Sequence, residues 1–490
     1  MKKSKKIENP NKCVKMSIIK KTFKNNSWLF ISQIITSIFG FFWIVLLARY
    51  LGVYDFGTLN FAISFSTIVN IFIDLGISIY ISRDLTQCPD LARKYIGNAI
   101  PLRIFLSIVT LIATLTILAV MNFDLLTIEI VLLFIIHAIF LSTGGLFNGV
   151  FQAYCKQKYQ SIGIILSSTL TLLGTLVLVH FDFGLISVAL AYISGSLVSL
   201  IYLYINIRKI TVLKFEFDFS FWKSAIKTSI PFGITIIFST IYYMIDTIML
   251  LFMEGSIAVG FYSSAYKIIT VFITIYAVYN FVVFPLMRKF YKDSNNLLMV
   301  SYEKSVKYMI IIMLPIAILT TIYAYDITTV IYGSQYYHGG DVLRILIWNV
   351  LFVMVNGASA NLLNSSNNES SVTKINVIGC VLNILFNLVS IYYLGYIGAS
   401  ITTVITGIII CIAMTYIITG CRYNPGKVLI YDVIKISIAG IILGAFLILV
   451  DFNLWITIPL AIIIYSISLI LTRSFDSVDK AIIKKIISRK

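Results

Sequence analysis

Charged side chains are scarce in this 490-residue chain, and their scarcity decides its class. Asp, Glu, Lys and Arg make up 12% of the residues, whereas hydrophobic residues make up 59% and the mean hydropathy is +0.95. A soluble domain carries roughly 25% charged residues, so the chain holds about half the charge that keeps a globular protein in water. Soluble enzymes, secreted disulfide scaffolds and disordered chains are therefore excluded, and the composition indicates an integral membrane protein.

Cysteine and histidine are rare as well, with six and three residues. The cysteines fall in predicted helices or on the predicted inner side of the membrane, so no disulfide is expected. No two histidines have the spacing of metal ligands. The longest loops, such as 208–227, are too short to fold as soluble domains. The sequence therefore predicts no cofactor, no metal site and no catalytic residue, and it places the function within the bilayer.

Long apolar runs take the place of polar segments. A helix needs about 20 apolar residues to cross the hydrocarbon core of a bilayer, and charge-free intervals of about that length recur along the sequence. One interval, 375–421, is twice as long and is divided by the turn sequence Gly395-Tyr396-Ile397-Gly398. We predict an all-α integral membrane protein with fourteen transmembrane helices. The predicted spans are 25–48, 56–73, 104–123, 130–155, 159–181, 183–207, 228–245, 268–287, 308–325, 345–368, the two halves of 375–421, 429–450 and 452–472.

Basic side chains separate cleanly between the two sides of the predicted membrane. With the N-terminus inside and the topology alternating, 34 of the 38 Lys and Arg residues lie in inner segments, as the positive-inside rule requires. We therefore predict that both termini are cytoplasmic. The net charge of +17 follows mostly from this topology and does not indicate nucleic-acid binding. The basic ends of the chain, including 480–490, are expected to rest on anionic lipid headgroups.

The chain contains a weak internal repeat. At an offset of 203 residues, Phe56–Ala62 falls on Val259–Ala265, and at an offset of 212, Ser194-Gly195 falls on Thr406-Gly407. These matches place helices 1 to 6 over helices 7 to 12. Because each half has an even number of helices, both halves begin on the same side, and the repeats are parallel. Two such bundles can enclose a cleft that faces either side, which is the architecture of an alternating-access transporter.

The repeat defines the predicted domain organisation. It comprises a basic cytoplasmic N-terminus (1–25), a first six-helix bundle (26–207), a cytoplasmic linker (208–227), a second six-helix bundle (228–420), two C-terminal helices (429–472) and a basic cytoplasmic tail (473–490).

Four sequence strings carry a resemblance to a known family. They are ARYLGVYDFGTLNFA at 48–62, FIDLGISIYISRDL at 72–85, IYGSQYYHGGDVLRIL at 331–346 and YYLGYIGASITTVITG at 392–407. With their order and spacing, the chain resembles the bacterial O-antigen and capsule repeat-unit flippases of the polysaccharide-transporter family. This family belongs to the multidrug, oligosaccharidyl-lipid and polysaccharide exporter superfamily. The likeness covers nearly the whole chain.

The resemblance implies a substrate, a mechanism and a location. An undecaprenyl-pyrophosphate-linked oligosaccharide would move from the cytoplasmic to the outer leaflet of the bacterial cytoplasmic (inner) membrane. The family is thought to use a cationic central cavity, rocking of two six-helix lobes and energy from an ion gradient. A polysaccharide polymerase and a chain-length regulator are candidate partners.

Four cations lie within or at the ends of predicted spans, where a charged side chain costs roughly 2.5–3.5 kcal/mol. Lys267 directly precedes the charge-free interval 268–287, about ten residues into predicted helix 8. This places it roughly 15 Å deep, near mid-membrane, where its stem reaches neither surface comfortably. We therefore expect Lys267 to bind the pyrophosphate of the substrate. Arg49, Arg103 and Arg344 are candidates for the same role, with snorkelling toward headgroups as the alternative for each.

Two carboxylates suggest ion coupling. Asp246 lies near the outer end of predicted helix 7, at a depth that differs from that of Lys267 by about 7 Å. One interpretation is a structural ion pair between the two residues. The other is a proton or sodium site at Asp246. Asp74 in the string FIDLG has the same two interpretations.

Other functions remain candidates from the sequence. A drug or cation exporter, or a flippase for a peptidoglycan precursor or teichoic acid, would have the same architecture. A membrane glycosyltransferase or polysaccharide polymerase is disfavoured, because such enzymes present a large outer loop or domain and the predicted outer loops here are short.

Overall fold

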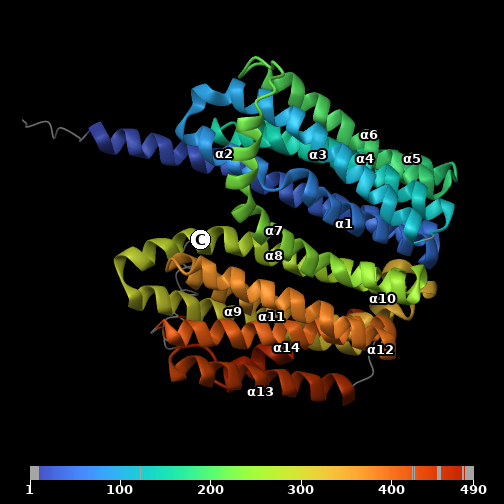
Figure 1. Ribbon diagram of the computed structural model, residues 1–490. Coiled ribbons are helices and arrows are strands. Elements are labelled where there is room, and N and C mark those ends of the chain that lie inside the picture. Colours follow the sequence, from blue (N-terminus) through green and yellow to red (C-terminus); the bar gives the residue numbers. More distant parts are fainter. Residues whose placement is uncertain are drawn as a thin grey trace, which may run out of the picture. The chain divides into compact units, whose positions relative to one another are not determined.

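The computed structural model of the chain describes residues 10–121, 123–421, 423, 425–449, 454–476 and 479, and helices joined by short connections make up these residues (Figure 1). The predicted all-α fold is confirmed. The helices are α1 (Pro10–Asp74), α2 (Ile77–Gln87), α3 (Ala92–Val120), α4 (Leu125–Ala153), α5 (Gln157–His180), α6 (Gly184–Ile207), α7 (Phe219–Glu254), α8 (Ser256–Asp293), α9 (Asn295–Ile322), α10 (Ala324–Tyr332), α11 (Gly339–Ser365), α12 (Glu369–Gly420), α13 (Lys427–Leu449) and α14 (Leu454–Leu471).

Eleven of the described helices are long and apolar enough to cross a membrane. Two of them, α1 and α12, contain a break at a glycine with positive φ, Gly52 (φ 73°) and Gly395 (φ 58°). Each half of these helices exceeds the roughly 20 residues that a span needs. Counting both halves of each broken helix, and adding the shorter α14, gives the fourteen predicted spans within the described residues.

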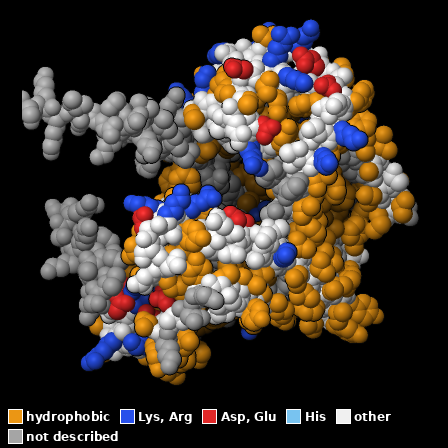
Figure 2. Space-filling model, turned by 60° about the vertical axis from the view of Figure 1, so that its left-hand side comes forward, with side chains coloured by type: hydrophobic (Ala, Val, Ile, Leu, Met, Phe, Trp, Pro, Cys, Tyr) orange, Lys and Arg blue, Asp and Glu red, His pale blue; other side chains and the backbone are white. Residues whose placement is uncertain are grey.

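The packing of α3 shows how these helices suit a lipid environment. One face of α3 buries polar side chains, among them Arg103, Ser107 and Thr114. The opposite face exposes Phe105 and Ile112, which are 53% and 59% exposed. A soluble helix has the reverse arrangement. Figure 2 shows the same contrast more widely, with hydrophobic side chains on the flanks of the helices and Lys and Arg side chains gathered toward their ends. The pattern is that of helices whose apolar sides face lipid and whose polar side chains pair inside the bundle.

The chain divides into two compact units. Unit 1 contains Met1–Leu51 and Thr58–Met244, and unit 2 contains Gly52–Gly57 and Ile245–Lys490. In unit 1, a hydrophobic core that includes Ile81, Leu102 and Phe151 joins α2, α3, α4 and α6. In unit 2, α11 is the central helix and packs against α8, α9 and α12.

The segment between α6 and α7 packs on unit 1. The backbone N–H of Glu216 donates to the carbonyl oxygen of Gly97 at 3.0 Å, and the N–H of Asp218 donates to Asn98 Oδ1 at 2.8 Å. Asn98 also accepts, through its carbonyl oxygen, a hydrogen bond from Trp222 Nε1 at 3.1 Å. These bonds fix the polar segment against α3.

Two helix-borne lysines anchor the C-terminal part of unit 2. Lys304 Nζ lies 2.5 Å from Asp476 Oδ2 and 2.7 Å from Asp479 Oδ1. Lys307 Nζ lies 2.6 Å from Asp479 Oδ2 and 2.9 Å from Asp432 Oδ2. Both lysines lie within α9, which begins at residue 295 and therefore starts before the predicted span 308–325, and Lys307 is 1% exposed. These lysines therefore tie α13 and the segment after α14 to α9.

Candidate functional site

Arg103 and Asp74 form a closed polar cluster in unit 1. Arg103 comes from α3 and is 1% exposed, and its Nη2 lies 2.5 Å from Oδ1 of Asp74, the last residue of α1. Arg103 Nη1 donates to the carbonyl oxygen of Ser142 on α4 at 2.8 Å, and Ser78 Oγ on α2 donates to the same Asp74 oxygen at 2.6 Å. The guanidinium is therefore held in the protein interior and does not extend toward headgroups, so the snorkelling interpretation of Arg103 is wrong.

Asp246 is the centre of a second polar cluster, in unit 2. It comes from α7 and is 2% exposed. Its Oδ2 accepts hydrogen bonds from Tyr262 on α8 at 2.6 Å and from Thr403 on α12 at 2.7 Å. Its Oδ1 accepts from Asn387 Nδ2, also on α12, at 2.6 Å. All three donors are neutral, so the charge of the carboxylate is not compensated within this cluster.

The expected ion pair between Asp246 and Lys267 is absent from the described residues. The reason is helix geometry. Tyr262 is the residue of α8 that contacts Asp246, and Lys267 follows it by five residues, which is about 7.5 Å along the axis and about 140° around it. Lys267 therefore projects from another side of α8.

Lys267 is a half-buried cation within a membrane-spanning helix. It follows the first residue of α8 by eleven positions, which corresponds to about 16 Å, or half the thickness of a hydrocarbon core. Within the described part of the chain, no hydrogen bond or ion pair engages its ammonium group. Since a cation at that depth is costly, it is a candidate for binding an anion.

The two other predicted cations lie near helix ends. Arg344 is exposed in the second turn of α11, where its Nη1 donates to the hydroxyl of Tyr325 at 3.3 Å. That hydroxyl in turn donates to Asp341 Oδ1 at 2.6 Å, and this hydrogen bond raises the pKa of Tyr325. Arg49 is exposed three residues before the break of α1 at Gly52. The four cations are thus divided between the units, with Arg49 and Arg103 in unit 1 and Lys267 and Arg344 in unit 2.

The sequence analysis missed the neutral partners of Asp246. A search for charged residues in apolar spans does not find Tyr262, Asn387 and Thr403, because these side chains are neutral. One signal could have indicated them. Asn383 and Asn387 are four residues apart in an otherwise apolar run, so they share a helix face, and both are fully buried. Their side chains are joined by a hydrogen bond of 3.2 Å.

A metal centre built from several His, Cys or carboxylate side chains does not occur in the described residues. The oxygen atoms around Asp246 form a different kind of site. One carboxylate, a phenol, a threonine hydroxyl and an amide gather there, and Asn387 Oδ1 is buried without a hydrogen-bond partner among the described residues. Oxygen atoms of these types are the ligands that hard cations prefer.

Solved structures with a similar fold are membrane transporters. A lipid II flippase MurJ in an inward closed conformation matches with a TM-score of 0.77 and 17% identity, over 92% of this chain and 99% of that chain. A multidrug resistance MATE family transporter of the MOP superfamily, in an inward-facing conformation, matches with a TM-score of 0.65 and 14% identity, over 80% of this chain and 96% of that chain. At these identities the likeness concerns the fold.

Sequence comparisons give the family. An uncharacterized membrane protein of Methanocaldococcus jannaschii, MJ1068, is 29% identical over 212 residues, which is 42% of each chain. The chain therefore aligns with less than half the length of this curated relative. The MatE family model matches residues 231–389. The family model described as polysaccharide biosynthesis protein matches residues 22–291. Because this match covers more than half of the 490 residues, the chain belongs to the family of polysaccharide biosynthesis proteins.

Proposed function

We propose that the protein is a flippase that moves undecaprenyl-pyrophosphate-linked oligosaccharide repeat units, of O-antigen or capsule, from the cytoplasmic to the outer leaflet. The observation that carries the proposal is Lys267, a cation about 16 Å into a membrane helix and without a counter-charge among the described residues. Membership of the polysaccharide biosynthesis family and the fold shared with a lipid II flippase support it. The protein would work in the cytoplasmic membrane by alternating access, with both termini in the cytoplasm.

Lys267 would compensate the pyrophosphate during translocation. A pyrophosphate carries several negative charges, and a fixed cation lowers the cost of moving it through a medium of low dielectric constant. Arg49 and Arg344, which are exposed, would assist at the ends of the path. Arg103 would act through its buried pair with Asp74, by holding α1, α2, α3 and α4 in register.

Asp246 would bind the coupling ion, a sodium ion or a proton. Its buried carboxylate has only neutral hydrogen-bond donors, and an uncompensated carboxylate in a membrane bundle favours a bound cation. The carboxylate lies on α7 and its donors lie on α8 and α12, so binding of an ion would change the contacts among these helices. Such coupling would allow an ion gradient to drive the substrate cycle.

Translocation in proteoliposomes tests the role of Lys267. A lipid-linked saccharide in the vesicle bilayer becomes resistant to an added glycosidase when it moves to the inner leaflet. We expect the Lys267→Ala variant to lose translocation at least tenfold. Lys267→Arg should retain part of it, because the charge remains. The control is Lys374→Ala, since Lys374 is an exposed cation near the first residue of α12. Unchanged translocation in Lys267→Ala, with normal folding, would remove Lys267 from the mechanism.

A drug or cation exporter is the second candidate, because the MatE model matches residues 231–389. The same vesicles distinguish the two functions. An exporter would accumulate a fluorescent organic cation against its gradient without any lipid-linked saccharide, and Lys267→Ala would leave that uptake intact. A flippase would not accumulate the organic cation in this way, and Lys267→Ala would reduce its translocation of the lipid-linked saccharide.

A further inference from the structure

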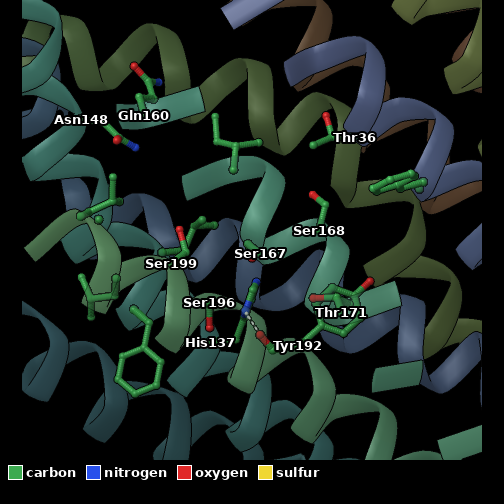
Figure 3. Close-up of a pocket in the computed structure, with 18 of the residues that line it drawn as sticks. Thr36, His137, Asn148, Gln160, Ser167, Ser168, Thr171, Tyr192, Ser196 and Ser199 are labelled. Carbon is green, nitrogen blue, oxygen red and sulfur yellow. Dashed lines mark hydrogen bonds between the residues drawn. The ribbon is translucent and has the colours of Figure 1, made fainter. Parts of the chain in front are cut away.

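Unit 1 contains a pocket that the sequence analysis did not anticipate. Its volume is about 300 Å³, and it lies among α1, α4, α5 and α6 (Figure 3). Asn148 and Gln160 lie at one end, and His137, Tyr192 and Thr171 lie toward the other. Because residues 137 and 148 of α4 are eleven positions apart, the pocket extends roughly 16 Å along the helices. It is large enough for a small organic ligand.

The lining of the pocket combines aromatic rings with uncharged polar groups. Trp43 and Tyr192 form an aromatic corner, with ring centroids 4.9 Å apart and ring planes at 89°. Trp43 Nε1 donates to Thr175 Oγ1 at 3.0 Å, and His137 Nδ1 lies 3.2 Å from the carbonyl oxygen of Tyr192, so these side chains are held in place. Among the described residues that line the pocket, none is Lys, Arg, Asp or Glu. A pyrophosphate or an organic cation would find no counter-charge there.

Several hydroxyl groups in the pocket are available to a ligand. In a membrane helix, Ser and Thr commonly donate to the carbonyl three or four residues earlier, as Thr143 and Ser196 do here. Ser167, Ser168 and Ser199 form no such bond within the described part of the chain. These three serines are half-buried, and Asn148 Oδ1 is buried and has no partner among the described residues. A buried polar group such as this amide oxygen is costly unless a ligand or water satisfies it.

We propose that this pocket binds a neutral sugar ring. A pyranose presents apolar C–H faces, which pack on aromatic rings, and a rim of hydroxyl groups, which exchange hydrogen bonds with serine, threonine and amide side chains. The aromatic corner and the free hydroxyls supply both features, and the lack of charge in the lining selects against the phosphate part of a lipid-linked saccharide. The inference deepens the proposed function, on which it rests for the source of the sugar. The pocket would hold part of the glycan of the lipid-linked saccharide.

Sugar binding is measured on the full-length protein in a detergent without a sugar headgroup. The probes are the methyl glycosides of glucose, galactose, mannose and N-acetylglucosamine, and glucuronic acid is the charged comparison. Trp43 fluorescence reports binding in a chain whose other four tryptophans, Trp28, Trp222, Trp348 and Trp455, are phenylalanine. Thermal stabilisation of the unaltered chain is the second readout. We expect a saturable change with at least one neutral glycoside and none with glucuronic acid.

A pocket-filling substitution gives the decisive variant. A Cβ added at Gly40 would have no atom within 4 Å, so Gly40→Leu fills the pocket without a clash at that atom. Gly420→Leu is the matched control, because the surroundings of Gly420 are equally open and it lies outside the pocket. Gly40→Leu should weaken sugar binding at least tenfold and Ser168→Ala about threefold, while Gly420→Leu and Lys267→Ala should bind normally.

Failure of this inference and failure of the proposed function are distinguishable. Absence of saturable binding by every glycoside, or equal binding by Gly40→Leu and Gly420→Leu, would overturn the sugar site even if translocation is normal. Saturable binding of an organic cation that Gly40→Leu abolishes, with no sugar effect, would assign the pocket to a drug-like ligand and overturn the proposal. Sugar binding that persists in a Lys267→Ala variant unable to translocate would support both.

Discussion

The carboxylates of Asp74 in unit 1 and Asp246 in unit 2 have opposite surroundings. Asp74, whose side chain is 22% exposed, lies 2.5 Å from the guanidinium of Arg103, so the charges cancel within one cluster. Asp246 is buried, and the neutral side chains of Tyr262, Thr403 and Asn387 donate hydrogen bonds to it. A closed ion pair needs no ligand and serves to hold helices together. The uncompensated carboxylate of Asp246 and the unpaired ammonium of Lys267 both leave charge that a ligand can neutralise, and we propose that these two groups of unit 2 take part in transport.

Removal of Arg103 should cause the largest loss of stability. Arg103→Ala leaves Asp74 without its cation, and the loss should be up to about 3 kcal/mol, less than for a fully buried pair, because the side chain of Asp74 is 22% exposed. Thermal unfolding in detergent, followed by tryptophan fluorescence, measures the loss. The double variant Arg103→Ala with Asp74→Asn removes both charges and should recover much of the stability. If Arg103→Ala alone unfolds at the temperature of the unaltered protein, the two clusters do not differ as described.

Removal of the charge at Asp246 should have the converse effect. Asp246→Asn is close in shape and eliminates an uncompensated buried charge, so the unfolding temperature should hold or rise. Translocation should lose its dependence on the cation gradient, and vesicles with sodium or proton gradients of either direction would measure this. Asp74→Asn is the comparison. It should lower stability without altering the choice of coupling ion, and a loss of ion dependence in Asp74→Asn would contradict the assignment of roles.

Acid should loosen the C-terminal anchor of unit 2, in which Asp479 pairs with Lys304 and Lys307. Burial raises the pKa of Asp479, but hydrogen bonds donated by Lys304, Lys307 and Tyr308 outweigh burial and hold the pKa well below its usual range. A carboxyl group with a depressed pKa contributes stability above its unfolded pKa of about 3.9, and this contribution is lost as the pH falls toward the folded value. The unfolding temperature should therefore fall below about pH 4.

The anchor can be isolated by one substitution. Asp479→Asn should lower the unfolding temperature at neutral pH and flatten its decline in acid. An acid profile identical to that of the unaltered protein would show that other carboxyl groups govern the acid response.

The sequence predicted the helices better than it predicted the clusters. Spans are visible because about 20 apolar residues must be contiguous in the chain, and each predicted span corresponds to a helix or half of a broken helix. Side-chain partners are not contiguous. Asp246 bonds to Asn387 and Thr403, which are 141 and 157 residues away, and no spacing rule connects them. Similar depths along two helices suggested a pair between Asp246 and Lys267. The two residues face different directions around α8, however, and Tyr262 is the residue of α8 that contacts Asp246.

The pocket in unit 1 was hidden for a related reason. Serine and threonine occur throughout these helices and usually satisfy themselves on the preceding turn, so their number in α5 and α6 carries no signal. Only the fold shows that Ser167 and Ser168 of α5 and Ser199 of α6 line the same space. Charged residues in an apolar sequence can be identified from the sequence alone, whereas a pocket of neutral polar side chains can be identified only from the packing of the helices.

The smallest expected effect concerns one hydrogen bond of the Asp246 cluster. Tyr262→Phe removes the hydroxyl that donates to Asp246 Oδ2 at 2.6 Å and keeps the ring. Hydrogen bonds between helices in membrane proteins contribute about 0.6 kcal/mol on average, so the unfolding temperature should change little. The coupling ion should nevertheless bind several-fold more weakly, because one of the oxygen atoms around the carboxylate is gone. Tyr266→Phe, one turn further along α8, is the matched control, since it also removes a phenol hydroxyl and its ring stacks on that of Tyr262 with centroids 5.9 Å apart. A large loss of stability in Tyr262→Phe with unchanged ion dependence would mean that the cluster in unit 2 is as purely structural as the pair in unit 1.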